Sequence, residues 1–354
     1  MLTRRAAKQR NSIATWLPNE ILTAVMSHAS RPDLVALCRT SRLFRNLATR
    51  LLYRIVALQT AAQLKAFLRT IESKRSQIAA LRLSDHVRRF AIRDSKCTAN
   101  LPKRTAESFT SVLLQLHNLE SLDLLFNSKV DLTETLNRAH FKNLSEFRYT
   151  VQFEDHPSLS FFLNRHPTIT RLTLHPEFEA QNQVSLDTIH LPHLTFYDGP
   201  SSFVPFFDKS TTSGVTFVCI LFLPESPNRD DLDMALMRLA PMTALHTFAA
   251  FTMLDDIPES LLLESAARNI PWIEFAMLQS VRHNPAPISR ADARAIAKSL
   301  QKLPSLRFLA LEVDGVEHKD FETVAFWSRA CRNLTLVTLR TSNKLDAQAR
   351  AVDE

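Results

Sequence analysis

The chain has 354 residues, of which 45% are hydrophobic and 22% are charged. These shares are typical of a folded protein and exclude an intrinsically disordered chain. No stretch reaches the roughly 18 uninterrupted apolar residues that a membrane span requires, so we expect no membrane partner. The length suits two or three compact units or one extended repeat array.

The net charge of +7 is unevenly distributed. Residues 1–104 contain 21 Lys and Arg against 5 Asp and Glu, a net charge of +16, and the remaining residues carry a net charge of −9. This split indicates either a basic front that meets an acidic partner or a solvated basic face. The acid-free start of the chain would suit a nuclear-import or nucleic-acid patch or a mitochondrial presequence, and we favour a disordered basic tail over residues 1–14. Its basic residues are Arg4, Arg5, Lys8 and Arg10.

The four cysteines, Cys38, Cys97, Cys219 and Cys331, lie far apart and form no Cys-x-x-Cys pair. Such spacing favours neither a disulfide framework nor a cysteine zinc site, so we expect a reducing compartment, the cytoplasm or the nucleus. His190 and His193 are separated by a proline that breaks helical geometry, and we expect no metal there.

Signatures of catalysis are absent from the sequence. With 3 glycines in the chain, no phosphate-cradling loop can be built, and there is no G-x-S-x-G nucleophile elbow. We therefore expect no catalytic residues and no cofactor, although a triad assembled from distant residues cannot be recognised from spacing alone.

Three helices are predicted within residues 15–55. The first opens at Leu17 and Pro18, where the missing proline N–H is harmless. A second is predicted from Pro32 with Asp33 as its N-cap, and a third after Ser41. A unit this small is marginal alone, so we expect part of its apolar surface to bind a partner. Apolar residues recur at helical spacing at Ile21, Leu22, Val25, Met26, Leu34, Leu37, Cys38, Leu43, Phe44, Leu47, Ala48, Leu51 and Leu52.

From residue 78 onward the pattern L-x-x-L-x-L recurs. Copies begin at Leu119, Leu144, Ile169 and Leu194, each 25 residues apart, within the roughly 20–29 residue period of leucine-rich repeats. Helix-like stretches between the copies end at prolines, which stop a helix and release the chain into a strand. We predict an α/β repeat, an irregular solenoid with a parallel sheet on its concave face. Later copies begin at Val215, Leu245, Ile273, Leu306 and Leu334, with Ile78-Leu81-Leu83 as an atypical first copy.

The N-terminal module resembles the F-box. The matching elements are Leu17-Pro18-x-Glu20-Ile21-Leu22, Asp33-Leu34-x-x-Leu37, Ser41-x-x-Phe44-x-x-Leu47-Ala48 and Leu52-Tyr53-Arg54. The segment Leu191-Pro192-His193-Leu194-x-x-Tyr197-x-Gly199-Pro200, followed by Ser201-Ser202-Phe203, resembles a feature of fungal F-box proteins with degenerate leucine-rich repeats. The resemblance implies binding to the Skp-type adaptor of a cullin-based SCF ubiquitin ligase, with the repeats as receptor for an unknown target protein.

The resemblance also implies a set of adaptor contacts, for which burial in the helical core is the alternative. They are Leu17, Pro18, Glu20, Ile21, Leu22, Val25, Leu34 and Leu37. The target-binding residues are unknown. Positions that flank the strand leucines and could contribute are Glu120, Ser121, Asp123, Glu146, Arg148, Arg171, Thr173, Arg307 and Ala310.

The predicted order is a basic tail (1–14), an F-box (15–55), a linker helix (56–77), a leucine-rich-repeat-like solenoid (78–342) and a C-terminal tail (343–354). A second hypothesis is a protein-interaction scaffold outside any ligase, and a third is a DNA-associated repeat protein. A second basic cluster lacks interleaved aromatic residues that could stack on bases, so we do not expect nucleic-acid binding. Its members are Arg88, Arg89, Arg93, Lys96, Lys103 and Arg104.

Overall fold

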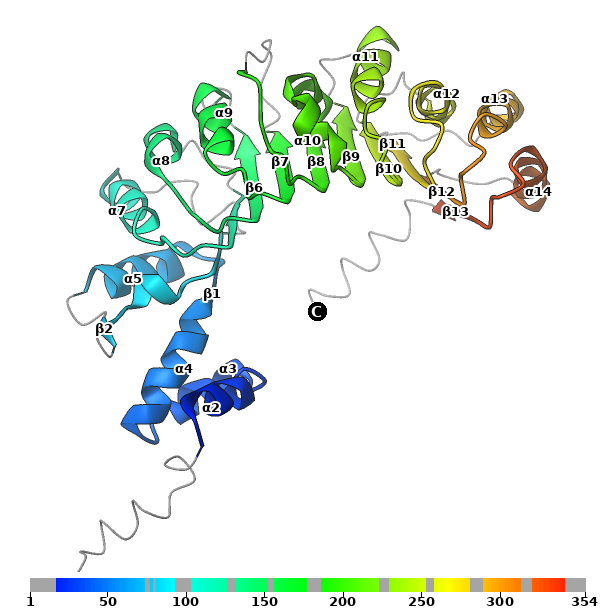
Figure 1. The fold of residues 1–354 in the computed structure, drawn as a ribbon. Coiled ribbons are helices and arrows are strands. Elements are labelled where there is room, and N and C mark those ends of the chain that lie inside the picture. The colour runs from blue at the N-terminus through cyan, green and yellow to red at the C-terminus, as the bar shows by residue number, and fades with distance from the viewer. Residues whose placement is uncertain are drawn as a thin grey trace, which may run out of the picture. The chain divides into compact units, whose positions relative to one another are not determined.

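The computed structural model describes residues 17–73, 77–78, 81–92, 103–125, 132–151, 156–176, 186–222, 229–252, 258–280, 289–312 and 320–340. The chain divides into two compact units, Met1–Leu144 and Ser145–Glu354. The predicted fold class is confirmed, because a helical N-terminal module precedes parallel strands that alternate with helices (Figure 1). The predicted tails, 1–14 and 343–354, lie outside the described residues.

The N-terminal module consists of helices α2 (Asn19–Met26), α3 (Arg31–Leu37) and α4 (Arg42–Arg54). Ser41 caps α4 as predicted, accepting a hydrogen bond from the backbone N–H of Phe44 at 3.2 Å. The predicted cap of α3 is wrong, since Ser30 and not Asp33 takes that position. The Ser30 hydroxyl donates to the Asp33 carboxylate at 2.6 Å, so Asp33 supports the cap from the first turn.

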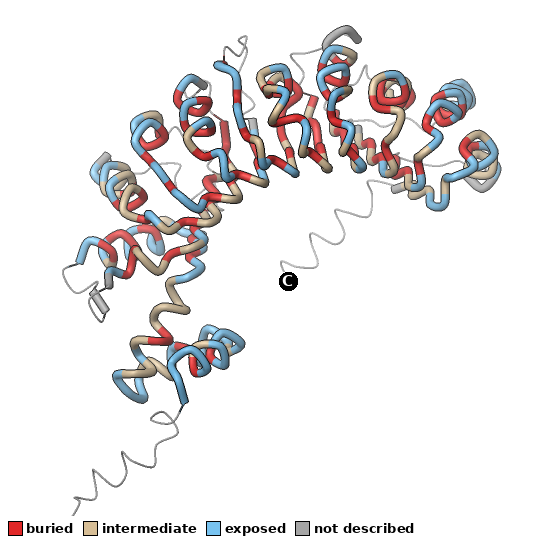
Figure 2. Tube along the Cα trace, viewed as in Figure 1, coloured by how far each residue is buried: buried red, intermediate tan, exposed pale blue. Residues whose placement is uncertain are grey.

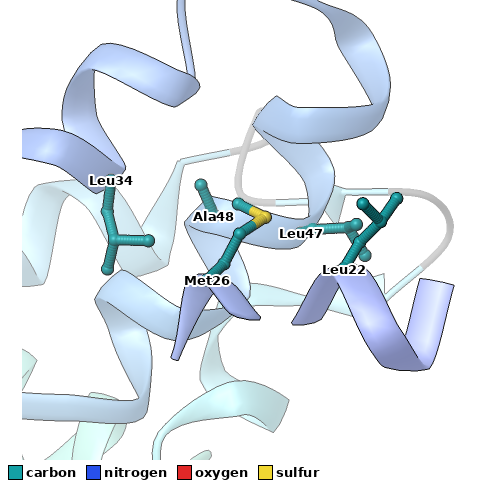
Figure 3. Close-up of a cluster of buried hydrophobic side chains, with 5 residues drawn as sticks. All are labelled: Leu22, Met26, Leu34, Leu47 and Ala48. Atoms are coloured by element: carbon teal, nitrogen blue, oxygen red, sulfur yellow. The ribbon is translucent and has the colours of Figure 1, made fainter. Parts of the chain in front are cut away.

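The core of the module is a small cluster to which all three helices contribute. Figure 3 shows Leu22 and Met26 of α2, Leu34 of α3, and Leu47 and Ala48 of α4 pointing into one space. Because α4 supplies its side chains one turn after another, it is the element on which the two shorter helices pack. The module therefore has a core of its own, but a small one.

The rest of the first unit is the start of the repeat array. Strands β1 (Ile55–Leu58), β4 (Arg89–Ile92) and β5 (Ser121–Leu124) pair in parallel in this order. Between them the chain forms α5 (Ala61–Glu72), the short antiparallel pair β2 (Gln77–Ile78) and β3 (Leu81–Arg82), a 3₁₀ turn η2 (Leu83–His86) and α7 (Lys103–Leu113). Helix α8 (Thr133–Arg138) follows β5.

Two predictions about this region are corrected. The segment 56–77, expected to be a linker helix, contains the helix α5, but it begins inside strand β1, where the buried Val56 and Leu58 alternate with exposed neighbours. Ile78-Leu81-Leu83 is not a repeat copy, because among the described residues β2 and β3 form a separate antiparallel pair outside the parallel sheet. The true copy is Val87-Phe90-Ile92, three residues that are almost completely buried. It escaped notice because the insert before it breaks the interval between copies.

The second unit contains eight parallel strands among the described residues, in chain order across the sheet. They are β6 (Glu146–Val151), β7 (Arg171–Pro176), β8 (Phe196–Pro200), β9 (Phe217–Phe222), β10 (Thr247–Thr252), β11 (Phe275–Ser280), β12 (Phe308–Glu312) and β13 (Leu336–Arg340). The helical segments between them are α9 (His156–Asn164), η4 (Ser201–Phe206), α10 (Lys209–Ser213), α11 (Arg229–Leu239), α12 (Glu259–Asn269), α13 (Arg290–Leu300) and α14 (Asp320–Ala330). In Figure 1 the strands of this unit follow one side and its helices the other.

The leucine pattern sets the register of the second unit. The middle residue of each predicted copy pairs with the middle residue of the next, as in Phe147 with Leu172 and Leu172 with Tyr197. The residues of the pattern are buried between strands and helices, where Figure 2 shows the buried positions gathered. Threonines reinforce the stack. The Thr195 hydroxyl donates to the Thr170 carbonyl at 3.0 Å, and the Thr216 hydroxyl to the Thr195 carbonyl at 3.1 Å.

Candidate functional site

Helix α2 carries an apolar face that the module does not cover. Ile21 and Val25 are four residues apart on α2 and lie on one side of the helix, and the exposed Leu17 precedes the helix by two residues. We call these three residues the module face. The Ile21 side chain is 49% exposed and that of Val25 is 65% exposed. Pro18 and Glu20 are exposed at the start of the same helix. Exposed apolar side chains on and directly before one helix are the pattern expected of a helix that packs against a partner.

The predicted adaptor contacts divide into two groups. Leu22 and Leu34 are 7% and 6% exposed and belong to the core cluster, and Leu37 packs partly buried against that cluster. We therefore assign Leu22 and Leu34 to the core and not to a contact surface. Sequence spacing could not separate them from their neighbours, because an apolar residue on a short helix suits either side. Val35 of α3 is exposed and was missed for the same reason.

Hydrogen bonds hold the helices that support the module face. The Arg45 guanidinium donates through Nε to the Cys38 carbonyl at 3.0 Å, which joins α4 to the end of α3. The Arg31 guanidinium donates to the Ile55 carbonyl at 2.7 Å, which ties the start of α3 to strand β1. These bonds fix the module internally, so a partner meets a preformed surface.

A second apolar surface lies on the strands of the second unit. The first residue of each strand pairs with the first residue of the next strand, so these residues form a row across the sheet. Because side chains alternate along a strand, the row lies on the face opposite to the buried leucines. We name the aromatic members, Phe196, Phe217, Phe275 and Phe308, the aromatic row. The full row runs Glu146, Arg171, Phe196, Phe217, Thr247, Phe275, Phe308 and Leu336.

Ring contacts order the aromatic row. The Phe196 and Phe217 rings stack with centroids 4.6 Å apart and planes 12° apart, and the Phe275 and Phe308 centroids are 6.1 Å apart. The Arg171 guanidinium lies 4.0 Å from the centroid of Phe196 and places a positive charge at one end of the row. Phe275 remains 41% exposed.

Small residues lie beside the aromatic row. Two positions further along their strands, Cys219, Ala249 and Ala310 are buried between larger neighbours. Burial raises the pKa of the Cys219 thiol, with a further contribution from the charge of Asp198, so this cysteine is a packing residue and not a nucleophile. Aromatic rings therefore lie beside small buried side chains on strands β9 and β12, a combination that can receive the side chains of another protein.

The flanking positions suggested by the sequence fall in several environments. Glu146 and Arg171 belong to the same row as the phenylalanines, whereas Thr173 and Ala310 are buried. Glu120 and Arg307 lie in the turns that precede strands β5 and β12. The aromatic row itself was missed, because the flanking positions suggested by the sequence included none of its four phenylalanines. The L-x-x-L-x-L frame contains the signal, since it places these residues one position before its second leucine.

A histidine cluster in the second unit resembles a catalytic arrangement only superficially. His190 Nδ1 lies 2.7 Å from the Asp208 carboxylate and 3.0 Å from the Ser210 hydroxyl, so both partners meet the same ring nitrogen. A serine nucleophile requires the opposite nitrogen. Asp208 instead caps α10 by accepting the Thr211 N–H at 2.7 Å, and these hydrogen bonds lower the pKa of its carboxyl against the opposing effect of burial. The cluster is a helix cap.

Within the described ranges, no three His, Cys, Asp or Glu side chains come together as metal ligands. None of the helices that the structure describes has the length and apolar composition needed to cross a bilayer.

A small helical module with an uncovered apolar face, followed by parallel strands that alternate with helices, defines a modular protein of the α/β repeat class. Residues 16–59 match the family model described as F-box-like. The chain therefore carries an F-box-like domain, as the resemblance of Leu17–Arg54 implied. The match includes β1 as well as the three helices. No curated protein matches the chain.

Proposed function

We propose that this chain is the substrate-recognition subunit of an SCF-type ubiquitin ligase. The F-box-like domain would bind a Skp-type adaptor and, through it, a cullin. The observation that carries this proposal is the module face of Leu17, Ile21 and Val25, which is exposed on a domain that matches the F-box-like family model. Pro18, directly before α2, and Val35 of α3 extend the exposed apolar surface available to the adaptor.

The domain's own charges favour the same partner class. Residues 16–59 contain six arginines against Glu20 and Asp33, a net charge of +4, and the longer segment 1–104 carries a net charge of +16. A basic domain steers towards an acidic protein and gains association rate from that attraction. The apolar module face would then supply most of the binding energy, since a few buried anchors dominate an interface.

Target recognition belongs to the strand surface of the second unit in this proposal. Exposed phenylalanines are favourable contact residues because each offers a large rigid area with little conformational entropy to lose. The aromatic row would receive a target segment with apolar side chains, and Arg171 would favour an acidic group near the Phe196 end. The chain would perform no chemistry itself and would act by holding the target close to a conjugating enzyme. This role places the protein in the cytoplasm or nucleus.

The test uses one double variant and one matched control. Ile21→Asp with Val25→Asp places two carboxylates on the module face, and Met234→Asp with Met237→Asp places the same charge at similarly exposed apolar positions on α11. Tagged full chains are purified from cells, and Skp-type adaptor, cullin and ubiquitylated proteins are quantified. We expect the double variant to lose all three and the control to retain them. A wild-type chain that retains the adaptor without cullin would instead support a scaffold outside the ligase. A double variant that retains both adaptor and cullin would refute the proposed surface.

A further inference from the structure

A basic pocket lies in the first unit where helix α4 ends and the strands begin. It has a volume of about 360 Å³. Its lining residues are Arg50, Leu51, Arg54, His86, Arg88 and Glu120. The pocket is remote in sequence from the module face and from the aromatic row, so neither proposed interface accounts for it.

The repeat geometry itself brings these charges together. Arg54, Arg88 and Glu120 occupy the same place in three successive repeats, directly before strands β1, β4 and β5. The Arg88 N–H donates to the Arg54 carbonyl at 2.9 Å, and the Glu120 N–H donates to the Arg88 carbonyl at 2.7 Å. Arg50 lies one helical turn before Arg54 on α4 and therefore on the same side of that helix. The backbone thus holds three guanidinium groups around one depression.

The charges in the pocket are not balanced by its lining. Glu120 is the one acid among the lining residues, and its carboxylate lies 3.8 Å from Arg88 Nε. Arg88 also donates to the Asn118 carbonyl at 3.0 Å. Arg50 Nε and His86 Nε2 are buried and have no hydrogen-bond partner within the part of the chain that the structure describes. Buried polar nitrogens without partners are rare in proteins and call for a ligand or another explanation.

The electrostatics of His86 agree with this excess of positive charge. Burial lowers the pKa of His86, and the charges of Arg50 and Arg88 lower it further, while Asp85 acts in the opposite direction. A cationic environment that disfavours another proton is one that favours an anion. Guanidinium groups are the usual ligands of phosphoryl oxygens because their paired N–H groups match them in geometry.

We propose that the basic pocket binds a small anion that carries more than one phosphoryl group. Three guanidinium groups against one carboxylate leave a positive excess that a multivalent anion can neutralise. The volume falls in the range of small-ligand sites, about 300–1,000 Å³, and exceeds what one phosphate needs. Arg50 Nε and His86 Nε2 would donate to phosphoryl oxygens from the floor, and Arg54 and Arg88 would close over the anion from the rim.

The experiment is calorimetric titration of the purified full chain with pyrophosphate and, separately, with inorganic phosphate, at constant ionic strength. We expect one saturable site that binds pyrophosphate more tightly than phosphate. Arg54→Gln and Arg88→Gln should each weaken pyrophosphate binding about ten-fold, because each removes a charge-assisted contact. Arg69→Gln, an exposed arginine on α5 that does not line the pocket, is the matched control and should leave the affinity unchanged.

Two outcomes would overturn the proposal. Binding that does not saturate, or that Arg69→Gln weakens as much as Arg88→Gln, would mean diffuse attraction to a basic surface. Wild-type affinity in both pocket variants would mean that the anion binds elsewhere. Arg54 has an exposed side chain, so its replacement is expected to leave the fold intact, and circular dichroism of each variant checks this.

Discussion

Ile21 and Leu22 are neighbours on helix α2, and their side chains enter opposite environments. Leu22 is 7% exposed and lies in the core cluster, whereas Ile21 is 49% exposed on the module face. The two residues are similar in size and hydrophobicity. Their roles therefore separate by position alone, and this makes them a matched pair for distinguishing folding from binding.

Alanine substitutions should separate the two roles. Leu22→Ala should destabilise the F-box-like domain by about 2–5 kcal/mol because it leaves a cavity in a small core. Ile21→Ala should change stability by about 0.5 kcal/mol or less and weaken adaptor binding by about 1–3 kcal/mol. Urea denaturation and titration with a Skp-type adaptor measure the two quantities. Equal loss of stability in both variants would contradict the assignment of Ile21 to a contact surface.

The aromatic row should determine which proteins the chain captures. Phe217→Ala with Phe308→Ala removes one ring from each ring pair. Both rings lie on the strand face opposite to the buried leucines, so the fold should survive. We expect proximity labelling to lose a defined set of partners while the adaptor signal is kept. Met234→Ala with Met237→Ala, exposed on helix α11, is the control. A partner list unchanged from wild type would remove the aromatic row from the proposal.

Gly199 should tolerate no larger residue, for a steric reason. A Cβ at this position would lie 2.8 Å from Tyr197 Oη and 3.1 Å from Leu174 Cβ. Gly199→Ala is therefore expected to destabilise the chain by about 1–3 kcal/mol. Tyr197→Phe should cost about 1–2 kcal/mol, because the buried hydroxyl donates to the Pro200 carbonyl at 2.8 Å.

The double variant provides a check on this mechanism. Removing the Tyr197 hydroxyl eliminates the closest contact with the new methyl group, so the combined loss of stability should be smaller than the sum of the two single losses. Thermal unfolding of the four proteins measures the difference. Strict additivity would show that crowding against Leu174 or the backbone dominates instead.

Anion binding in the basic pocket should strengthen as pH falls. The folded chain holds the pKa of His86 below its ordinary value of 6.5, so the ring contributes stability above that pH which is lost on acidification. A bound anion reverses this by favouring the imidazolium. The charges that act on the ring are those of Arg50, Asp85 and Arg88, and Arg54 and Glu120 line the same pocket.

Sulfate is the suitable probe because its charge is constant across this range. We expect its dissociation constant to decrease several-fold from pH 8 to pH 5.5 in the wild-type chain, and His86→Gln to abolish that dependence while retaining some binding. Circular dichroism at each pH confirms that the chain stays folded. A pH profile that persists in His86→Gln would assign the titration to another group.

The recurrent leucine pattern was enough to predict parallel strands alternating with helices, because its period places apolar residues where stacked repeats bury them. The constant interval of 25 residues between successive copies from Leu119 to Leu194 was the main basis of that prediction. The helical module was equally visible from its caps and apolar stripes. Its identity as an F-box-like domain followed from the order of short elements between Leu17 and Arg54.

Other features emerged only from the tertiary structure. The repeat at Val87-Phe90-Ile92 became visible through its pairing with β1 and β5, since an insert obscures its spacing. Hydrophobicity alone does not show that Leu22 is buried and Ile21 exposed, or that the strand leucines face the core and the strand phenylalanines do not. Packing against neighbouring elements decides which side of a helix or strand is covered. The basic pocket likewise joins Arg50, His86 and Glu120, residues far apart in the chain that repeat stacking places around one site.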